Sequence, residues 1–276
     1  MRTRLLAAGT ATVAALGLAA AGALPASAAD GDAMLSVLHG VPDLTVDVWV
    51  NGERTLDDFT PGSLAGPLEL APGTYSVAIT AADAADASAP AIGPIDLTLA
   101  ADTNYTAVAH LDAAGAPTAT LFTNDTSTTD PGQGRLTVRH TAAAPAVDIL
   151  AGGSPVITNL SNPAEQVLDL PAATVSAAVA ATGTTTPVLG PADVPVTEGV
   201  NTIVYAWGSL EAGNLQLAVQ RIEGLHSAPA GVPSGELGLA SETSSDAPLW
   251  IGAALLLAVG GGLVVNRRIP ARASRD

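Results

Sequence analysis

An internal repeat with a period of about 100 residues limits the possible folds of this chain more than any other feature. Residues 35–50 (LSVLHGVPDLTVDVWV) align without a gap to residues 136–151 (LTVRHTAAAPAVDILA). Later residues correspond in the same order, and the offset stays between 97 and 101 residues. A period of this length indicates duplicated domains, because solenoids repeat over much shorter units.

Within each copy, apolar and polar residues alternate, which is typical of strands with one buried face. Val46, Val48 and Val50, for example, are separated by Asp47 and Trp49. Turns rich in glycine and proline separate such runs. Seven strands are predicted in the first copy, at about 34–39, 45–50, 66–70, 73–80, 92–99, 104–111 and 117–123. Seven short strands in about 95 residues predict an all-β chain of two tandem immunoglobulin-like β-sandwiches.

The repeat and the polar stretches around it give the expected domain boundaries. We expect the first domain at 30–123 and the second at 134–225. The polar, turn-rich residues 124–133 are interpreted as a linker. Residues 226–246 are rich in Ser, Gly, Pro and Ala, and they predict a flexible stalk.

The first 29 residues have the three parts of a secretory signal peptide. Arg2 and Arg4 precede a long uncharged apolar run, and Ala26 and Ala28 occupy the small-residue positions of a cleavage site. The alternative is an uncleaved N-terminal anchor. Cleavage is favoured, so residues 1–29 are expected to be removed and the rest exported.

A second apolar run at 247–265 predicts a transmembrane helix, because about 19 residues span most of a hydrocarbon core. Trp250 lies where an interfacial aromatic anchor is expected. Arg267 and Arg268 open a basic tail at 266–276, which favours a cytoplasmic C-terminus and extracellular domains. A buried core helix is the alternative. The lipid bilayer is therefore the first expected partner.

The residues before this helix also resemble part of a cell-wall sorting signal of Gram-positive bacteria. The segment 239–243 (LASET) looks like a degraded Leu-Ala-x-Thr-Gly pentapeptide that lacks the Thr-Gly pair. We therefore favour a retained single-pass membrane anchor over covalent attachment to the cell wall.

The charge of the expected extracellular part excludes some partners. Residues 30–246 contain four arginines and no lysine against 25 acidic residues, a net charge of −21. Such a surface repels nucleic acid, so we expect no nucleic-acid partner. The chain has no cysteine, which excludes disulfides, thiolate nucleophiles and thiolate metal sites.

Several short motifs in the first copy resemble those of a bacterial, actinobacterial-type surface-protein family. They are Val37-x-His39, Pro42-Asp43, Val46-Asp47-Val48-x-Val50, Gly52 and Leu70-x-Pro72-Gly73-Thr74-Tyr75-x-Val77. The family is catalogued only as a domain of unknown function with tandem immunoglobulin-like repeats. The resemblance covers roughly 34–222. It implies a fold and a surface location but no activity.

The best-matched polar residues are a histidine and an aspartate in each copy: His39 with Asp47, and His140 with Asp148. They could form a His–Asp pair that lines a binding loop. The interpretation we favour is structural: each histidine donates to a loop carbonyl, because the aspartate lies in the opposite strand phase. Trp49, in the outward phase, is predicted to be exposed and is the one aromatic that suggests sugar stacking.

No cofactor and no metal site is predicted. The histidines lack the close spacing of a zinc site, and the acidic clusters lack the alternating ligands of a calcium loop. Weak calcium binding at 124–130 is the best remaining metal hypothesis. There is no Gly-x-Ser-x-Gly nucleophile motif either.

The sequence thus favours a non-enzymatic, membrane-anchored surface protein: a two-domain rod that acts as an envelope spacer or binds an envelope protein. One alternative is an accessory module that binds carbohydrate or cell-wall polymer. The other is a surface hydrolase with a carboxylate pair, which would require clustered buried acids in a deep cleft.

Overall fold

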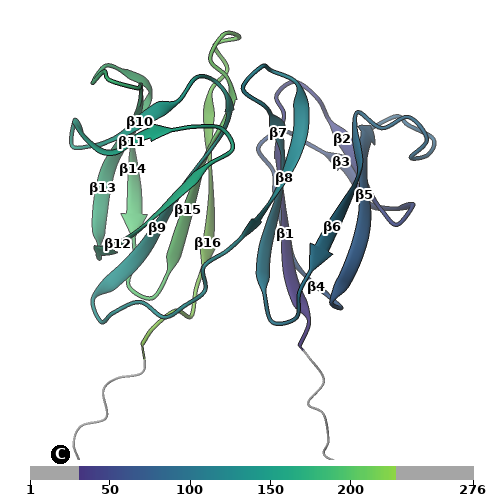
Figure 1. The fold of residues 1–276 in the computed structure, drawn as a ribbon, viewed down its shortest axis with the longest axis horizontal. Coiled ribbons are helices and arrows are strands. Elements are labelled where there is room, and N and C mark those ends of the chain that lie inside the picture. The colour runs from purple at the N-terminus through teal and green to yellow at the C-terminus, as the bar shows by residue number, and fades with distance from the viewer. Residues whose placement is uncertain (1–30, 228–276) are drawn as a thin grey trace, which may run out of the picture. The chain divides into compact units, whose positions relative to one another are not determined.

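A computed structural model of the protein describes residues 31–227. The predicted signal peptide, transmembrane helix and basic tail, and nearly all of the stalk, lie outside these residues. The described chain is all-β and forms four sheets of four strands each (Figure 1). This confirms the prediction of an all-β chain built from β-sandwiches. Within residues 31–227, no helix has the length and hydropathy needed to cross a membrane.

Each copy of the repeat forms one sandwich of eight strands. The first contains β1 (Ala33–Gly40), β2 (Val46–Val50), β3 (Glu53–Phe59), β4 (Leu64–Leu70), β5 (Gly73–Ala81), β6 (Ile92–Leu99), β7 (Asn104–Leu111) and β8 (Pro117–Thr123). The second contains β9 (Gln133–Ala143), β10 (Val147–Ala151), β11 (Ser154–Leu160), β12 (Glu165–Pro171), β13 (Ala173–Ala181), β14 (Pro187–Val196), β15 (Asn201–Ser209) and β16 (Gln216–Ile222).

The two sandwiches have the same topology. In the first, the sheet orders are β4-β1-β7-β8 and β3-β2-β5-β6, and in the second they are β12-β9-β15-β16 and β11-β10-β13-β14. The pairs β1/β7 and β9/β15 are parallel, and the other pairs are antiparallel. The strand registers agree as well. Met34 lies opposite Asn104 in the first sandwich, and the equivalent residues of the second, Arg135 and Asn201, also lie opposite each other. The sequence repeat is therefore a repeat of structure.

Two details of the predicted fold are wrong. The strand β3 was missed, because its sequence ERTLDDF is mostly exposed and carries charges that strands usually avoid. Such charge is common on edge strands, which is where β3 lies. The topology also differs from the immunoglobulin arrangement, in which the first two strands share a sheet. Here β1 and β2 lie in different sheets.

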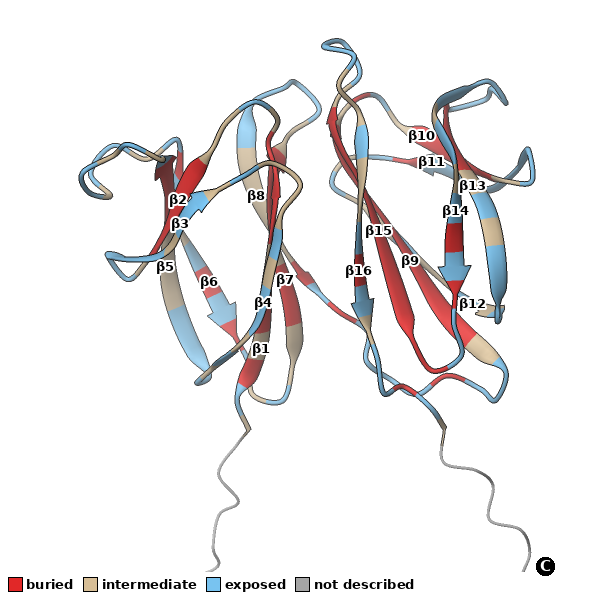
Figure 2. Cartoon of the chain, turned by 180° about the vertical axis from the view of Figure 1, so that it is seen from behind, coloured by how far each residue is buried: buried red, intermediate tan, exposed pale blue. Residues whose placement is uncertain are grey.

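The two sandwiches contact each other through the outward faces of two sheets. Figure 2 shows β9 and β15 buried along most of their length, as expected for strands covered on both faces. One apolar cluster contains side chains of both sandwiches: Leu38, Val108 and Phe122 from the first, and Ile203 and Tyr205 from the second. The two sandwiches are therefore joined through sheet faces, an arrangement that the sequence analysis did not predict.

Arg139 is the polar centre of this contact and is only 1% exposed. Its guanidinium donates to Glu165 Oε2 at 2.7 Å, to Tyr205 Oη at 2.7 Å and to Asn124 Oδ1 at 2.9 Å. It also lies 4.3 Å from the centre of the Phe122 ring. Because partners come from both sandwiches, this buried cation is paired and the interface is specific.

A second polar link crosses the interface beside Arg139. The hydroxyl of Tyr205 donates to Gln220 Oε1 at 2.6 Å, and Thr106 of the first sandwich donates to the same oxygen at 2.9 Å. Burial raises the pKa of Tyr205, and the nearby charge of Arg139 opposes this shift. The hydroxyl therefore stays protonated at neutral pH and keeps its role as donor.

The strand registers place the start and the end of the described chain at corresponding ends of the two sandwiches. In the first, β1 and β7 begin together, and Tyr105 near the start of β7 lies opposite Thr123 at the end of β8. In the second, Asn201 at the start of β15 lies opposite both Arg135 and Ile222. The chain therefore enters the first sandwich, passes through the linker and leaves the second sandwich at these ends.

Three of the loops at the opposite ends of the sheets, which we call the distal loops, are 41–45, 60–63 and 210–215. They connect β1 to β2, β3 to β4 and β15 to β16. The distal loops therefore lie at the far ends of the strands from both flanking segments of the chain.

Candidate functional site

The two repeated histidines fix loops, as the structural interpretation predicted. His39 donates from Nε2 to Leu44 O at 2.6 Å, and His140 donates from Nε2 to Pro145 O at 3.1 Å. Each side chain is 1% exposed, and burial lowers the pKa of both. Both imidazoles are therefore neutral at pH 7 and hold the loop that follows the first strand of their sandwich.

The two repeated aspartates do not pair with these histidines. Asp47 Oδ1 accepts the backbone N–H of Asp58 at 2.9 Å, and Asp148 Oδ1 accepts that of Asn159 at 2.8 Å. Asp58 and Asn159 are equivalent positions with positive φ, 52° and 57°, at irregular points of β3 and β11. Each carboxylate thus stabilises a strained residue of an edge strand.

Asp148 accepts a further backbone N–H, that of Gly183, at 2.9 Å. The N–H groups of Asn159 and Gly183 lower the pKa of the Asp148 carboxyl below its usual value, because they favour the charged form. The carboxylate is therefore ionised at neutral pH, and it accepts hydrogen bonds from the backbone.

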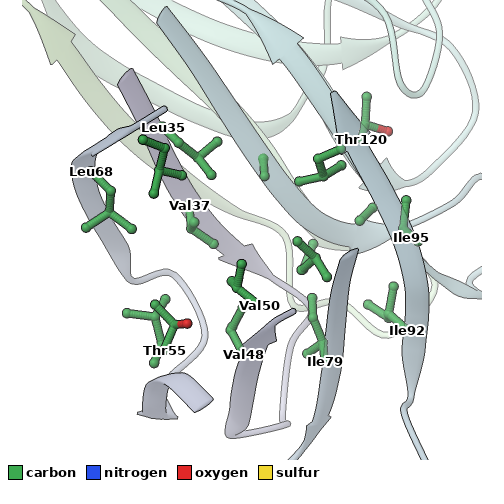
Figure 3. A pocket seen from close by; sticks show the side chains of 17 residues that line it. Leu35, Val37, Val48, Val50, Thr55, Leu68, Ile79, Ile92, Ile95 and Thr120 are labelled. Carbon is green, nitrogen blue, oxygen red and sulfur yellow. The ribbon is translucent and has the colours of Figure 1, made fainter. Parts of the chain in front are cut away.

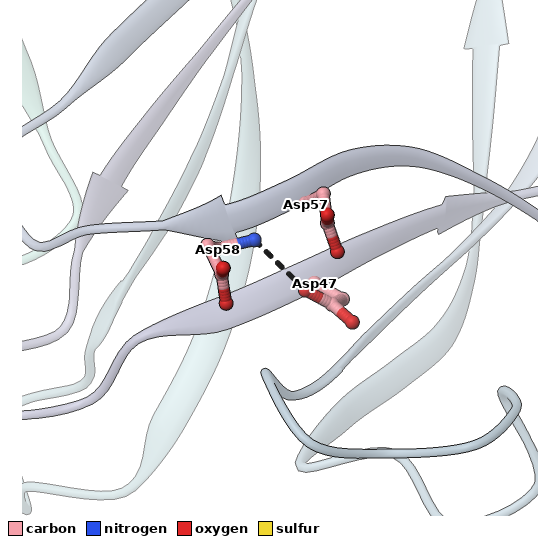
Figure 4. Close-up of side chains that lie close together, drawn as sticks. All are labelled: Asp47, Asp57 and Asp58. Atoms are coloured by element: carbon pink, nitrogen blue, oxygen red, sulfur yellow. Dashed lines mark hydrogen bonds between the residues drawn. The ribbon is translucent and has the colours of Figure 1, made fainter.

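Asp47 also belongs to an acidic cluster with Asp57 and Asp58, shown in Figure 4. Their carboxylate oxygens lie within 4.8 Å of one another, a spacing that could suit a cation. Arg54 already supplies that charge: its Nη1 lies 3.1 Å from Asp47 and 2.9 Å from Asp57. Asp57 is 65% exposed, so this group does not form the deep, buried carboxylate pair that the hydrolase hypothesis requires.

The prediction that Trp49 is exposed is wrong, because its side chain is 9% exposed. Its Nε1–H donates to Thr80 Oγ1 at 2.9 Å, and Arg54 lies 5.7 Å from the ring centre. Strand phase places Trp49 on the outer face, but side chains from neighbouring strands cover that face. Trp49 is therefore unavailable for stacking on a sugar.

The linker is held by arginines at the positions suggested for calcium. Arg135 Nη1 lies 2.8 Å from Asp125 Oδ1, and Arg139 donates to Asn124. Burial acts to raise the pKa of Asp125, but the bonds from Ser127 and the charge of Arg135 prevail and lower it. Two guanidinium groups thus use the oxygens that a calcium ion would need.

The distal loops and strand ends surround an open, mostly polar pocket of about 260 Å³. Its residues come from both sandwiches: Pro42, Asp43, Leu44, Thr45, Pro61, Trp207, Asn214 and Gln216. Asn214 Nδ2 donates to Asp43 Oδ2 across the two sandwiches at 3.3 Å. We call this the distal pocket. His39 supports one wall of it, because the carbonyl it binds belongs to Leu44.

Trp207 gives the distal pocket an unusual feature. The residue is 2% exposed, and its buried Nε1–H has no hydrogen-bond acceptor within the described residues. A buried donor without a partner is costly, and buried polar groups are nearly always hydrogen-bonded. Sequence reasoning missed this pocket because its residues are far apart in the chain. The available signal was Trp207 in place of His110, the equivalent residue of the first copy.

Comparison with known proteins gives one family. Residues 33–150 match the family described as Domain of unknown function (DUF4397). The match spans the first sandwich and reaches into β10 of the second. The resemblance to a domain of unknown function is thereby confirmed. No curated protein matches the chain.

Proposed function

We propose that this chain, which carries a domain of the DUF4397 family, is a non-enzymatic surface protein that presents a rigid pair of β-sandwiches outside the cell membrane. The observation that carries the proposal is the shared position of chain entry and exit. An anchor attached at that end leaves the distal loops at the end of the strands remote from the bilayer. The interface around Arg139 keeps the pair together as one body.

The location rests on the two ends of the sequence. A signal peptide at 1–29 exports the chain, and an apolar helix at 247–265 retains it in the membrane. Arg267 and Arg268 keep the tail inside. The charge of −21 over 30–246 suits an extracellular surface that stays soluble between the membrane and its partners.

The absence of catalysis is proposed from how the reactive side chains are used. His39 and His140 bind loop carbonyls, and Asp47 and Asp148 bind backbone N–H groups. Each is committed to folding, so none is free to act as a general acid or base on a substrate.

Protease treatment of intact cells tests the location. We expect external protease to release an acidic fragment of roughly 30–225, while the segment that follows stays with the membrane. A matched chain truncated before residue 247 should appear in the medium instead. Recovery of the full chain in the cytosol, or a fragment that resists protease on intact cells and becomes sensitive only after lysis, would reject the proposed location.

Carbohydrate binding is the second candidate, and the distal pocket is the observation that favours it. The pocket offers hydroxyl, amide and carboxylate groups, from Thr45, Asn214, Gln216 and Asp43. Such groups suit a ligand rich in hydroxyls. Stacking is not part of this candidate, because both Trp49 and Trp207 are buried.

Glycan-array binding by the whole chain tests this candidate. Thr45→Val and Gln216→Ala, which remove polar groups from the distal pocket, should weaken any binding by about tenfold, because lost hydrogen bonds leave polar ligand groups unpaired. Thr98→Val, on an exposed position of β6, is the control and should bind as the parent does. Equal binding by all three variants would exclude the pocket.

A further inference from the structure

The first sandwich encloses a cavity between its two sheets, with a volume of about 130 Å³ (Figure 3). Both sheets contribute: Leu35 and Leu68 lie on one side, and Val48 and Ile79 lie on the other. Thr55, exposed on the edge strand β3, stands at its margin. The cavity therefore lies in the hydrophobic core and reaches towards the open edge of the sandwich.

The lining of this cavity is almost wholly aliphatic. Its two hydroxyl groups are already bonded: Thr120 Oγ1 pairs with His110 Nε2 at 2.9 Å, and Thr55 Oγ1 donates to Glu53 O at 3.3 Å. A buried water needs about two to four polar partners, which this lining does not offer. The cavity therefore suits neither water nor a charged ligand.

The second sandwich has the same fold, but its core holds two smaller spaces, of about 30 Å³ and about 40 Å³. Two inward positions account for much of the difference. Ala107 of β7 and Ala119 of β8 correspond to Val204 of β15 and Leu217 of β16, as the matching registers show. The larger side chains of the second copy occupy the space that the alanines leave open in the first.

A cavity of this size is costly to a core unless something fills it, because its lining loses van der Waals contacts. An apolar cavity of about 150 Å³ in another protein, lined by Leu, Ile and Phe, stays dry and binds benzene. From volume, lining and the contrast between copies, we propose that the first sandwich binds a small, uncharged apolar molecule of roughly benzene size in its core. This site is separate from the distal pocket and does not depend on the function proposed above.

Methyl NMR of the whole chain, labelled at Ile, Leu and Val methyls and held in lipid nanodiscs, tests the proposal with benzene as the probe. Partition of benzene into lipid is the same for every variant, so it cancels. We expect saturable shifts of the cavity methyls, such as those of Val48 and Ile79, while the equivalent methyls of Ile149 and Val179 remain unchanged. Those two residues line the smaller space of the second copy.

Two variants give the first sandwich the side chains that the second has at the equivalent positions: Ala119→Leu and Ala107→Val. Each should abolish the shifts or weaken benzene binding by at least roughly tenfold, since the added methyl groups use the space. Ala116→Leu adds the same volume on an exposed turn and should bind as the parent does. If Ala119→Leu does not fold, Ala107→Val still decides the matter. Absence of saturable shifts in the parent, equal shifts in both sandwiches, or full binding by the filled variants would overturn the proposal.

Discussion

The two sandwiches share their strand order, registers and two local devices, yet they differ at the positions where they meet and where their cores are filled. Both copies use a histidine to hold a loop carbonyl and an aspartate to hold a residue with positive φ. At the interface, Leu38 of the first copy corresponds to Arg139 of the second. In the interior, Ala119 corresponds to Leu217.

This contrast separates what the fold requires from what each copy has acquired. The retained residues satisfy backbone groups, which every copy of this topology must do. The interface residues complement each other because they differ: an aromatic and aliphatic face from one copy accepts a paired guanidinium from the other. In a chain with duplicated domains, residues that are the same in both copies are therefore the ones that the fold needs. Residues that differ between the copies are the ones with a role specific to one copy.

The largest effect is expected at the interface. Arg139→Ala leaves Glu165, Tyr205 and Asn124 without their donor, so it should lower the free energy of unfolding by about 3 kcal/mol. Denaturant unfolding followed by tryptophan fluorescence measures this, because Trp49 reports on the first sandwich and Trp207 on the second sandwich and its contact with Gly40 and Gly62. The third tryptophan, Trp250, belongs to the predicted transmembrane helix. The two transitions should also separate once the contact is weakened.

Arg221→Ala is the control for this change. Arg221 is exposed and makes one bond, from Nη2 to Thr197 Oγ1 at 3.0 Å, so its loss should cost less than about 0.5 kcal/mol. An Arg139→Ala variant as stable as Arg221→Ala would show that the two sandwiches do not depend on each other.

The difference between the two cores can be reversed in the second copy. Leu217→Ala removes the side chain that fills its interior, so it should lower the free energy of unfolding by about 2 kcal/mol. It should also give the second sandwich a cavity, so benzene should now shift the methyl signals of Ile149 and Val179. Destabilisation without new benzene shifts would mean that the core collapses and that the first copy is held open by other residues.

The shared aspartates give a smaller effect. Asp47→Ala leaves the N–H of Asp58 without its acceptor and removes one of the two carboxylates that Arg54 contacts, which should cost about 1–2 kcal/mol. Asp148→Ala should change stability in the same direction, because its acceptors serve Asn159 and Gly183. Hydrogen exchange should show β3 and β11 loosening first. Unchanged exchange in both strands would refute the role assigned to these carboxylates.

The sequence predicted the repeat and most strands because period-two alternation reflects burial directly. The sequence did not predict β3, because an edge strand needs no apolar face. It did not predict the sheet order either, because strand pairing depends on residues far apart in the chain. Trp49 shows the same limit: phase indicates which side of a sheet a residue faces, but not what covers that side.

The site was harder to predict than the fold. The roles of His39 and His140 followed from their strand phase and the adjacent loop, which are local properties. The distal pocket and the interface did not, since Asn214 and Asp43 lie 171 residues apart. Arg135 and Arg139 carried a signal that can be recognised: they are two of only four arginines in an acidic region, placed on the outward phase of one strand.

The smallest expected effect is a difference in acid sensitivity between the sandwiches. The first contains two buried histidines, His39 and His110, whereas the second has His140 and carries Trp207 at the position equivalent to His110. Burial lowers the pKa of all three from an ordinary value of 6.5. For His110, the hydrogen bond to Leu111 O and the charge of Asp112 oppose this lowering of the pKa, and His140 adds to it.

A lowered pKa means that the unfolded chain takes up the proton first. The stability that depends on neutral histidine is therefore complete above 6.5 and is lost as the pH falls below that value. The lowered pKa values of Asp125 and Asp148 act only below 3.8, so they do not confuse the comparison. Hydrogen exchange at about pH 7 and about pH 5 should show a larger loss of protection in the first sandwich. His39→Gln, which keeps a donor for Leu44 O, should reduce that loss. An equal loss of protection in both sandwiches would mean that protonation of the extra histidine in the first copy does not lower the stability of that sandwich.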